Sequence, residues 1–149
     1  MTSDLTSELK RAATSAFEQL GFFLPDHDLS EEQGGAPVVA SCRVRFQGPV
    51  PGIMEVVTAG SFLEELAGNM LGDDDVPPRE LILDALGEIS NVICGNVLPS
   101  LGGRSAVFDL EAPEVRMGEE STPPAGEKVA EVILGLDEGR AEISIRLDR

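Results

Sequence analysis

Two pairs of alternating segments constrain the fold of this chain more than any other feature of its sequence. Residues 37–47 alternate apolar and polar side chains, and residues 53–58 form a second strand-like run after a break rich in proline and glycine. Residues 128–136 and 141–147 repeat the pattern around a short Asp-Glu-Gly turn. Alternation with a period of two is typical of half-buried strands, and a short turn joins antiparallel neighbours. The sequence therefore predicts two β-hairpins.

Apolar residues recur at helical spacing in three other segments, over residues 3–20, 62–71 and 78–98. Ser61 and Glu64 match the pattern of a capping box at the start of the second of these helices. The second and third helices end in a weak internal repeat, because residues 66–71 resemble residues 93–98; duplication and coincidence are both open as its origin. These three segments are expected to be helical.

The remaining segments complete the expected topology. Short strands are predicted over residues 106–110 and 114–117, and loops over residues 25–35 and 119–126. A helix, a hairpin, two helices and further strands follow one another without the βαβ alternation of a parallel sheet. This order favours an α+β fold, with a mixed or antiparallel sheet packed by helices. A length of 149 residues is that of one domain, so residues 1–149 are expected to form a single domain.

The formal net charge of −16 narrows the classes of partner. Nucleic acids and anionic membranes are bound by clustered Lys and Arg, so neither is expected as a partner. A cationic protein surface would be attracted, although a high charge also serves solubility alone. The chain opens without the pattern of a signal peptide, and no apolar stretch approaches the length of a membrane span, so a cytoplasmic protein is expected.

The sequence offers little to a metal ion or to nucleophilic catalysis. His27, the one histidine, falls in a predicted loop, and Cys42 and Cys94 are expected to be buried thiols rather than zinc ligands. The acidic run 73–75 lacks the spacing and the glycine of a calcium loop and is expected to be a solvated linker. We therefore predict no metal site and no cofactor in this chain.

One polar constellation stands out on the predicted helix 78–98. Asp84, Glu88 and Asn91 are spaced i, i+4, i+7, so they form a line along one side of the helix. Gly87 and Gly95 flank this line, and each costs about 1 kcal/mol relative to alanine, which favours a role in close approach. The alternative is an ordinary solvent-exposed helix face. Ser90 and Asn96 point to the apolar side and are expected to be hydrogen-bonded core residues.

The helix resembles a known family signature. The pattern Asp84-x₃-Glu88-x₂-Asn91, the Gly-Asn pair that begins at Gly95, and Pro113 about 22 residues after Asn91 resemble the CheC/CheX/FliY family of response-regulator phosphatases, and in particular its CheX-like branch. The resemblance extends over most of the chain, from residue 6 to residue 147, through the order of elements and the helix pair.

The resemblance implies a function for each residue of the line. Glu88 would contact a lysine of a phosphorylated CheY-like receiver domain, and Asn91 would orient water against its aspartyl phosphate. Asp84, Gly87 and Gly95 would belong to the partner-binding surface. Mg²⁺ is expected in the receiver domain of the partner. The earlier helix of the repeated pair, over residues 62–71, lacks the Glu-Asn pair, so one site per chain is expected. The resemblance also implies a homodimer formed through a sheet edge.

Three functions remain open from the sequence. The first is a chemotaxis phosphatase that hydrolyses the receiver's aspartyl phosphate in two-component signalling. The second is a module that binds a response regulator or a flagellar-type partner without turnover, because small errors in geometry abolish catalysis. The third is an interaction scaffold for unrelated partners.

Overall fold

The structure, a computed structural model, describes residues 2–72, 75–103, 105–118 and 122–148. The helices are α1 (Thr2–Gln19), α2 (Glu31–Gly35), α3 (Phe62–Leu71), α4 (Arg79–Val97) and α5 (Pro99–Gly102). The strands are β1 (Val38–Gln47), β2 (Gly52–Ala59), β3 (Asp109–Leu110), β4 (Glu114–Met117), β5 (Glu127–Leu136) and β6 (Gly139–Leu147).

The strands form one antiparallel sheet in the order β3-β1-β2-β6-β5, and β4 pairs with β1 beside β3. Both predicted hairpins are present, as β1 with β2 and β5 with β6. The two hairpins meet through β2 and β6, which pair from Gly52 with Leu147 to Ala59 with Arg140. The prediction of an α+β fold with an antiparallel sheet is confirmed.

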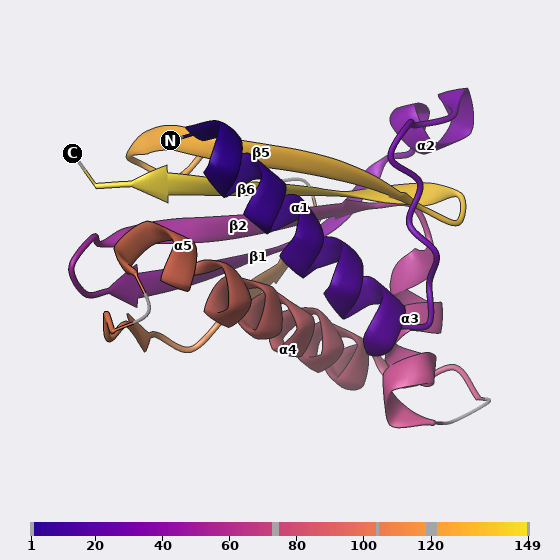
Figure 1. The fold of residues 1–149 in the computed structure, drawn as a ribbon. Helices are drawn as coiled ribbons and strands as arrows, with labels where there is room; N and C mark the ends of the chain where they lie inside the picture. The colour runs from indigo at the N-terminus through magenta and orange to yellow at the C-terminus, as the bar shows by residue number, and fades with distance from the viewer. Residues whose placement is uncertain (1, 73–74, 104, 119–121, 149) are drawn as a thin grey trace.

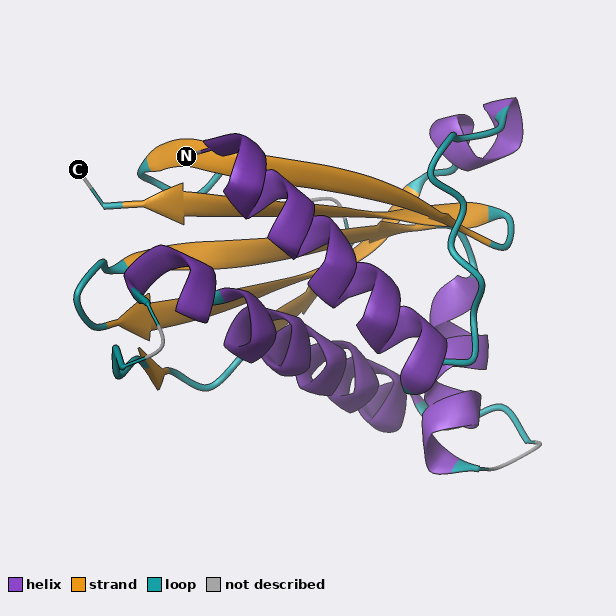
Figure 2. Ribbon diagram, in the orientation of Figure 1, coloured by secondary structure: helices purple, strands orange, loops and turns teal. Residues whose placement is uncertain are grey.

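Helices α1 and α4 lie across one face of the sheet, and no helix among the described residues covers the other face (Figures 1 and 2). The apolar members of each strand face the helices and form one core with them. The opposite face carries two charged pairs: Arg43 of β1 contacts Glu55 of β2 at 2.8 Å, and Arg140 contacts Glu142 along β6 at 2.7 Å. The alternation of the strands thus separates the core from a solvated face.

The prediction of a loop over residues 25–35 is wrong at its end, where α2 forms. Ser30 and Gln33 make a capping box: the Ser30 hydroxyl accepts from the Gln33 N–H at 3.1 Å, and Gln33 Oε1 accepts from the Ser30 N–H at 2.9 Å. The Ser-x-x-Gln pattern of such a box is visible in the sequence. A polar composition concealed it, because this short helix has no apolar stripe.

The capping box predicted at Ser61 is absent from α3. The backbone of Ser61 has φ −101° and ψ 10°, outside the extended region that a capping residue adopts, and its side chain makes no cap hydrogen bond. The end of α3 is as expected, since Gly72 adopts the left-handed conformation with φ 70°. The strand predicted over residues 106–110 is reduced to β3. Residues 73–74 and 119–121, from the predicted acidic linker and loop, lie outside the described residues.

Helices α4 and α5 contradict the expectation that no apolar stretch approaches the length of a membrane span. Residues 79–102 form a run of 24 residues whose best window has a mean hydropathy of 1.4, enough by length and composition to cross a membrane. Half of that window is buried inside the protein, as in the core helix of a soluble protein. The apolar character of α4 is therefore explained by its packing against α1, α3 and the sheet.

Candidate functional site

Helix α4 presents two different sides, as its sequence pattern predicts. Leu86, Ile89 and Ile93 are fully buried in the core between the sheet and the helices. Asp84 and Glu88, one turn apart on the opposite side, are exposed. None of the ion pairs among the described residues involves either carboxylate. Both are therefore free to meet a cationic group from outside.

Gly87 is buried because a neighbouring segment of the same chain packs on it. A Cβ atom at Gly87 would lie 3.2 Å from Cγ of Pro113 and 3.5 Å from Cγ2 of Val115. Such a contact with the proline ring is tighter than ordinary van der Waals distance. The close approach that Gly87 permits is thus to Pro113 and the start of β4, which border the polar side of the helix.

Asn91 lies one turn beyond Gly87 in the same row of the helix and is half-buried. Its Oδ1 atom is buried and has no hydrogen-bond partner among the described residues. A buried acceptor without a partner costs about 1–3 kcal/mol, and such atoms are rare in folded proteins. The carboxamide of Asn91 is therefore the one member of the line whose hydrogen bonding the fold leaves incomplete.

Gly95 completes the line on its exposed side. No atom lies within 4 Å of the position that its Cβ would take, so it faces open space. The structure thus brings all five predicted residues onto one side of α4. Asp84, Glu88 and Gly95 form an open ridge, and Gly87 and Asn91 stand at its border with the segment of Pro113.

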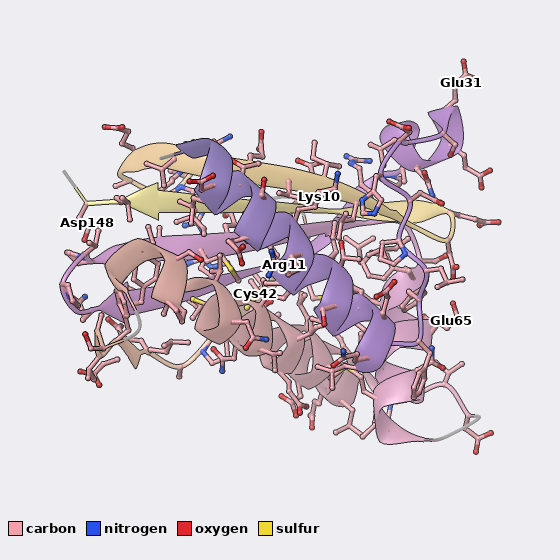
Figure 3. All side chains as sticks on the ribbon, viewed as in Figure 1. Lys10, Arg11, Glu31, Cys42, Glu65 and Asp148 are labelled. Atoms are coloured by element: carbon pink, nitrogen blue, oxygen red, sulfur yellow. The ribbon has the colours of Figure 1, made fainter. Side chains whose placement is uncertain are left out.

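The residues beneath this ridge are apolar or weakly polar. Ser90 is fully buried as predicted, but its hydroxyl finds no partner in good geometry and lies beside the Cys42 thiol. Burial raises the pKa of Cys42, and Ser90 partly opposes that increase. Burial, and to a lesser extent the neighbouring Cys42, raises the pKa of Cys94 to about 12. Both thiols are in the interior, where Figure 3 shows Cys42, and neither is poised as a nucleophile.

Two other predicted positions have different outcomes. Asn96 is exposed, so the prediction of a core role is wrong: in the last turns of α4 the sector that it occupies is open to solvent. His27 is exposed in the segment before α2. In the described parts of the chain, no group of three or more His, Cys, Asp or Glu side chains is placed to hold a metal ion.

A family comparison matches most of the chain. The family described as chemotaxis phosphatase CheX matches residues 40–135, which include the ridge, Pro113 and the sheet up to β5. A search of curated proteins finds no match.

Solved structures with the same fold cover nearly the whole chain. The chemotaxis protein CheX from Vibrio vulnificus is 19% identical with a TM-score of 0.78, and 99% of each chain is covered. The chemotaxis protein CheX from Desulfovibrio desulfuricans is 19% identical with a TM-score of 0.77, covering 97% of this chain and 99% of that one. The CheX–CheY–BeF₃–Mg²⁺ complex from Borrelia burgdorferi is 21% identical with a TM-score of 0.71, covering 96% and 97%.

Proposed function

The chain belongs to the CheX family of chemotaxis phosphatases, and from this premise we propose that it docks on a phosphorylated CheY-like receiver domain and promotes hydrolysis of its aspartyl phosphate. In this proposal Asn91 orients the attacking water and Glu88 contacts the receiver lysine. The observation that carries it is the pairing of an exposed Glu88 with an Asn91 whose carboxamide has an unused acceptor. The CheX–CheY complex from Borrelia burgdorferi supports the choice of partner.

The chemistry needs little from this chain. Water attacks the phosphorus atom in line with the acyl P–O bond, that bond breaks, and the products are phosphate and the aspartate carboxylate. An acyl phosphate is already activated, so alignment of the water supplies much of the acceleration. An asparagine aligns water by accepting one O–H and donating an N–H, and it need not remove a proton.

The half-buried position of Asn91 suits this task. Rotation about the terminal torsion of an asparagine is soft, so the two ends of the carboxamide exchange at small cost. Pro113 packs on Gly87, one turn before Asn91, and so forms a border of the proposed site. Gly87 thus acts indirectly in the proposal, whereas Asp84 and Gly95 contact the receiver on the open ridge.

Charge supports the direction of docking. The chain carries a net charge of −16, and Glu88 has no cationic partner of its own among the described residues. An approaching receiver lysine therefore gains an ion pair without breaking one. Mg²⁺ belongs to the receiver domain in this proposal, and residues 1–149 act as one cytoplasmic domain with a single site.

Dephosphorylation of a phosphorylated CheY-like receiver tests the roles of the two residues. Asn91→Ala is expected to lower the accelerated rate by about a hundredfold or more, because the water loses its alignment, and to leave receiver binding largely unchanged. Glu88→Ala is expected to weaken binding. Asn96→Ala is the matched control, since Asn96 is exposed on the same helix outside the ridge.

The same assay separates the alternative function, a binding module without turnover. Equal dephosphorylation by the wild type and Asn91→Ala, with receiver binding intact, would reject the catalytic assignment and leave the binding module. Absence of receiver binding would favour an interaction scaffold for other partners.

By analogy with the resemblance in the sequence, we also propose a homodimer formed through a sheet edge. Strand β5 of the terminal hairpin lies at one edge of the sheet, as that proposal requires. An edge strand presents unpaired backbone groups that a second copy can pair.

A further inference from the structure

A groove lies where α2, α3 and the start of α4 meet the edge of the sheet. None of the residues of the open ridge, Asp84, Glu88 and Gly95, lines it. Its volume is about 970 Å³. Its apolar lining includes Val39 of β1, Leu63 of α3, Ile82 of α4 and Met117 of β4, together with Val76 before α4. Val76 is 70% exposed and Met117 is 42% exposed. Apolar side chains from several elements thus face solvent in one concave surface.

The α2 wall of this groove is held by tertiary contacts. Gln33 is buried and donates to the Asp26 carboxylate and to the Asp137 carbonyl, each at 2.9 Å. Gly135 leaves the space that Gln33 occupies, because a Cβ there would lie 2.5 Å from Gln33 Oε1. Arg140 donates to the carbonyls of Gln33 and Ala36 at 2.9 Å. The groove is therefore preformed, which lowers the cost of ordering on binding.

The rim of the groove is acidic. Among the described residues, four glutamates line it, Glu31, Glu32, Glu64 and Glu138, against one cationic residue, Arg79. Glu31 and Glu65 project at the same end of the molecule in Figure 3. Just beyond the rim, a hydrogen bond with Asp137 raises the pKa of Glu65, with smaller contributions from burial and from the charge of Asp137. Carboxylates this crowded favour the arrival of positive charge.

The β1 backbone beside the groove is already paired, and β4, the outer strand there, spans only Glu114–Met117, so the edge offers little backbone to an added strand. The Pro37 carbonyl accepts from the Gly60 N–H at 3.0 Å, and the Val39 carbonyl accepts from the Gly118 N–H at 2.7 Å. Ala40 pairs with Met117 in the β1–β4 ladder. A helix needs no such edge, because its backbone bonds are internal.

The volume fits a short helix. One helical turn, taken as a cylinder about 10 Å wide and 5.4 Å long, fills about 420 Å³, so the groove holds about two turns. We propose that this groove binds a basic amphipathic helix of a partner protein, with apolar side chains on the Val39–Met117 floor and Lys or Arg against the glutamate rim. The proposal does not depend on the phosphatase function.

A designed peptide tests the proposal on the intact protein. The probe is a helical peptide of about four turns made of leucine and lysine, with leucines at i, i+3, i+4 and i+7. We expect it to bind with shifts of the backbone NMR signals of Val39, Ile82 and Met117. Replacement of its lysines by glutamate should abolish binding, and shuffling of its leucines should weaken binding at least tenfold.

Variants of the protein locate the binding. Met117→Glu and Val76→Glu are each expected to weaken peptide binding about tenfold or more, which corresponds to about 1.4 kcal/mol. Val107→Glu is the matched control, since Val107 is 77% exposed and does not line the groove. The double variant Glu31→Gln and Glu32→Gln tests the rim, against Asp109→Asn and Glu111→Gln as controls elsewhere on the surface. Circular dichroism verifies that each variant is folded.

Several results would overturn the proposal. Equal binding of the lysine and glutamate peptides, or of the shuffled peptide, would show adhesion without recognition of a basic helix. Equal weakening by Val107→Glu, or NMR shifts confined to another surface, would place the peptide elsewhere. Shifts of the groove signals with protein concentration alone would assign the groove to a second copy of this chain.

Discussion

At the scale of single residues, the buried polar atoms separate function from packing. Ser90 and Asn91 are neighbours on α4, and each has a buried oxygen without a partner in good geometry. Ser90 is sealed beneath the helix, beside Cys42, and can act only on the core. Asn91 is half-buried at the border of an exposed ridge, so its side chain lies near the surface although Oδ1 itself is covered. The same deficit therefore fits the proposed water-orienting role at Asn91, whereas at Ser90 it concerns packing alone.

The buried thiols give the protein an alkaline limit to its stability. The pKa of Cys94 is raised to about 12 in the folded state, from an ordinary value of 9.0. The folded protein holds the thiol proton more tightly than the unfolded chain, so this stabilisation is complete below pH 9 and is lost as pH rises toward 12. Within that window, the free energy of unfolding should fall by about 1.4 kcal/mol per pH unit from this one group.

Urea unfolding at a series of pH values measures this effect. The wild type is compared with Cys94→Ala, whose slope above pH 9 should be shallower, while the raised pKa of Cys42 leaves a smaller slope in place. The chain has no tyrosine, so no phenol titrates in the same range. Parallel curves for the two proteins would contradict the assignment to Cys94.

At the scale of elements, the two glycines of α4 form a natural pair for experiment. Gly95→Ala adds a methyl group in open space, so we expect a gain of about 0.5–1 kcal/mol in stability from helix propensity alone. Gly87→Ala adds the same group 3.2 Å from Pro113, so the gain should be cancelled or reversed. Thermal unfolding of the two variants measures the difference.

Receiver binding gives the same pair a second readout. If the receiver docks on the open ridge, Gly95→Ala should weaken its binding although the variant is more stable. Gly87→Ala should instead lower the dephosphorylation rate, by moving the Pro113 segment that packs one turn before Asn91. A stabilised Gly95→Ala variant with unchanged receiver affinity would remove Gly95 from the proposed contact surface.

The elements differ in how well the sequence alone predicts them. Periodicity alone locates α1, α3, α4 and both hairpins, because each has a long apolar pattern that matches its burial. The line of Asp84, Glu88 and Asn91 follows from helical geometry. Periodicity does not predict helix α2, because its position depends on a hydrogen bond from Gln33 to Asp137, 104 positions away. The acidic groove cannot be predicted in this way either, because several separate elements contribute its lining.

At the scale of the whole molecule, the helices that cover the sheet lie on one face in the part of the chain that the structure describes, and the two edges of the sheet differ in length. The β4 edge is short, whereas β5 spans Glu127–Leu136. On β5, both the N–H and the C=O of Gly135 bond outward to Asp26. By the alternation of an antiparallel strand, the backbone of Ile133 also faces outward, and Ile133 is 38% exposed. A second copy could extend the sheet from the outward groups of Ile133, beyond the pair that Gly135 makes with Asp26.

Sedimentation of the wild type and Ile133→Pro tests the dimer through this edge. Proline removes the outward N–H of Ile133 but not a hydrogen bond to β6, so the variant should remain folded and shift toward monomer. The wild type is expected to sediment as a dimer at high concentration. A wild-type monomer at every concentration would refute the dimer, and a dimer unaffected by the proline would move the interface away from β5.

The lack of a side chain at Gly135 has a consequence for the α2 wall of the acidic groove. The Gln33 side chain fills the space beside Gly135, and its amide joins Asp26 to the Asp137 turn. Any larger residue at position 135 would displace the Gln33 amide from Asp26 and Asp137, and α2 would then be held by the Arg140 hydrogen bonds alone. The absence of a side chain at Gly135 is thus what lets the Gln33 amide tie one wall of the groove to the Asp137 turn.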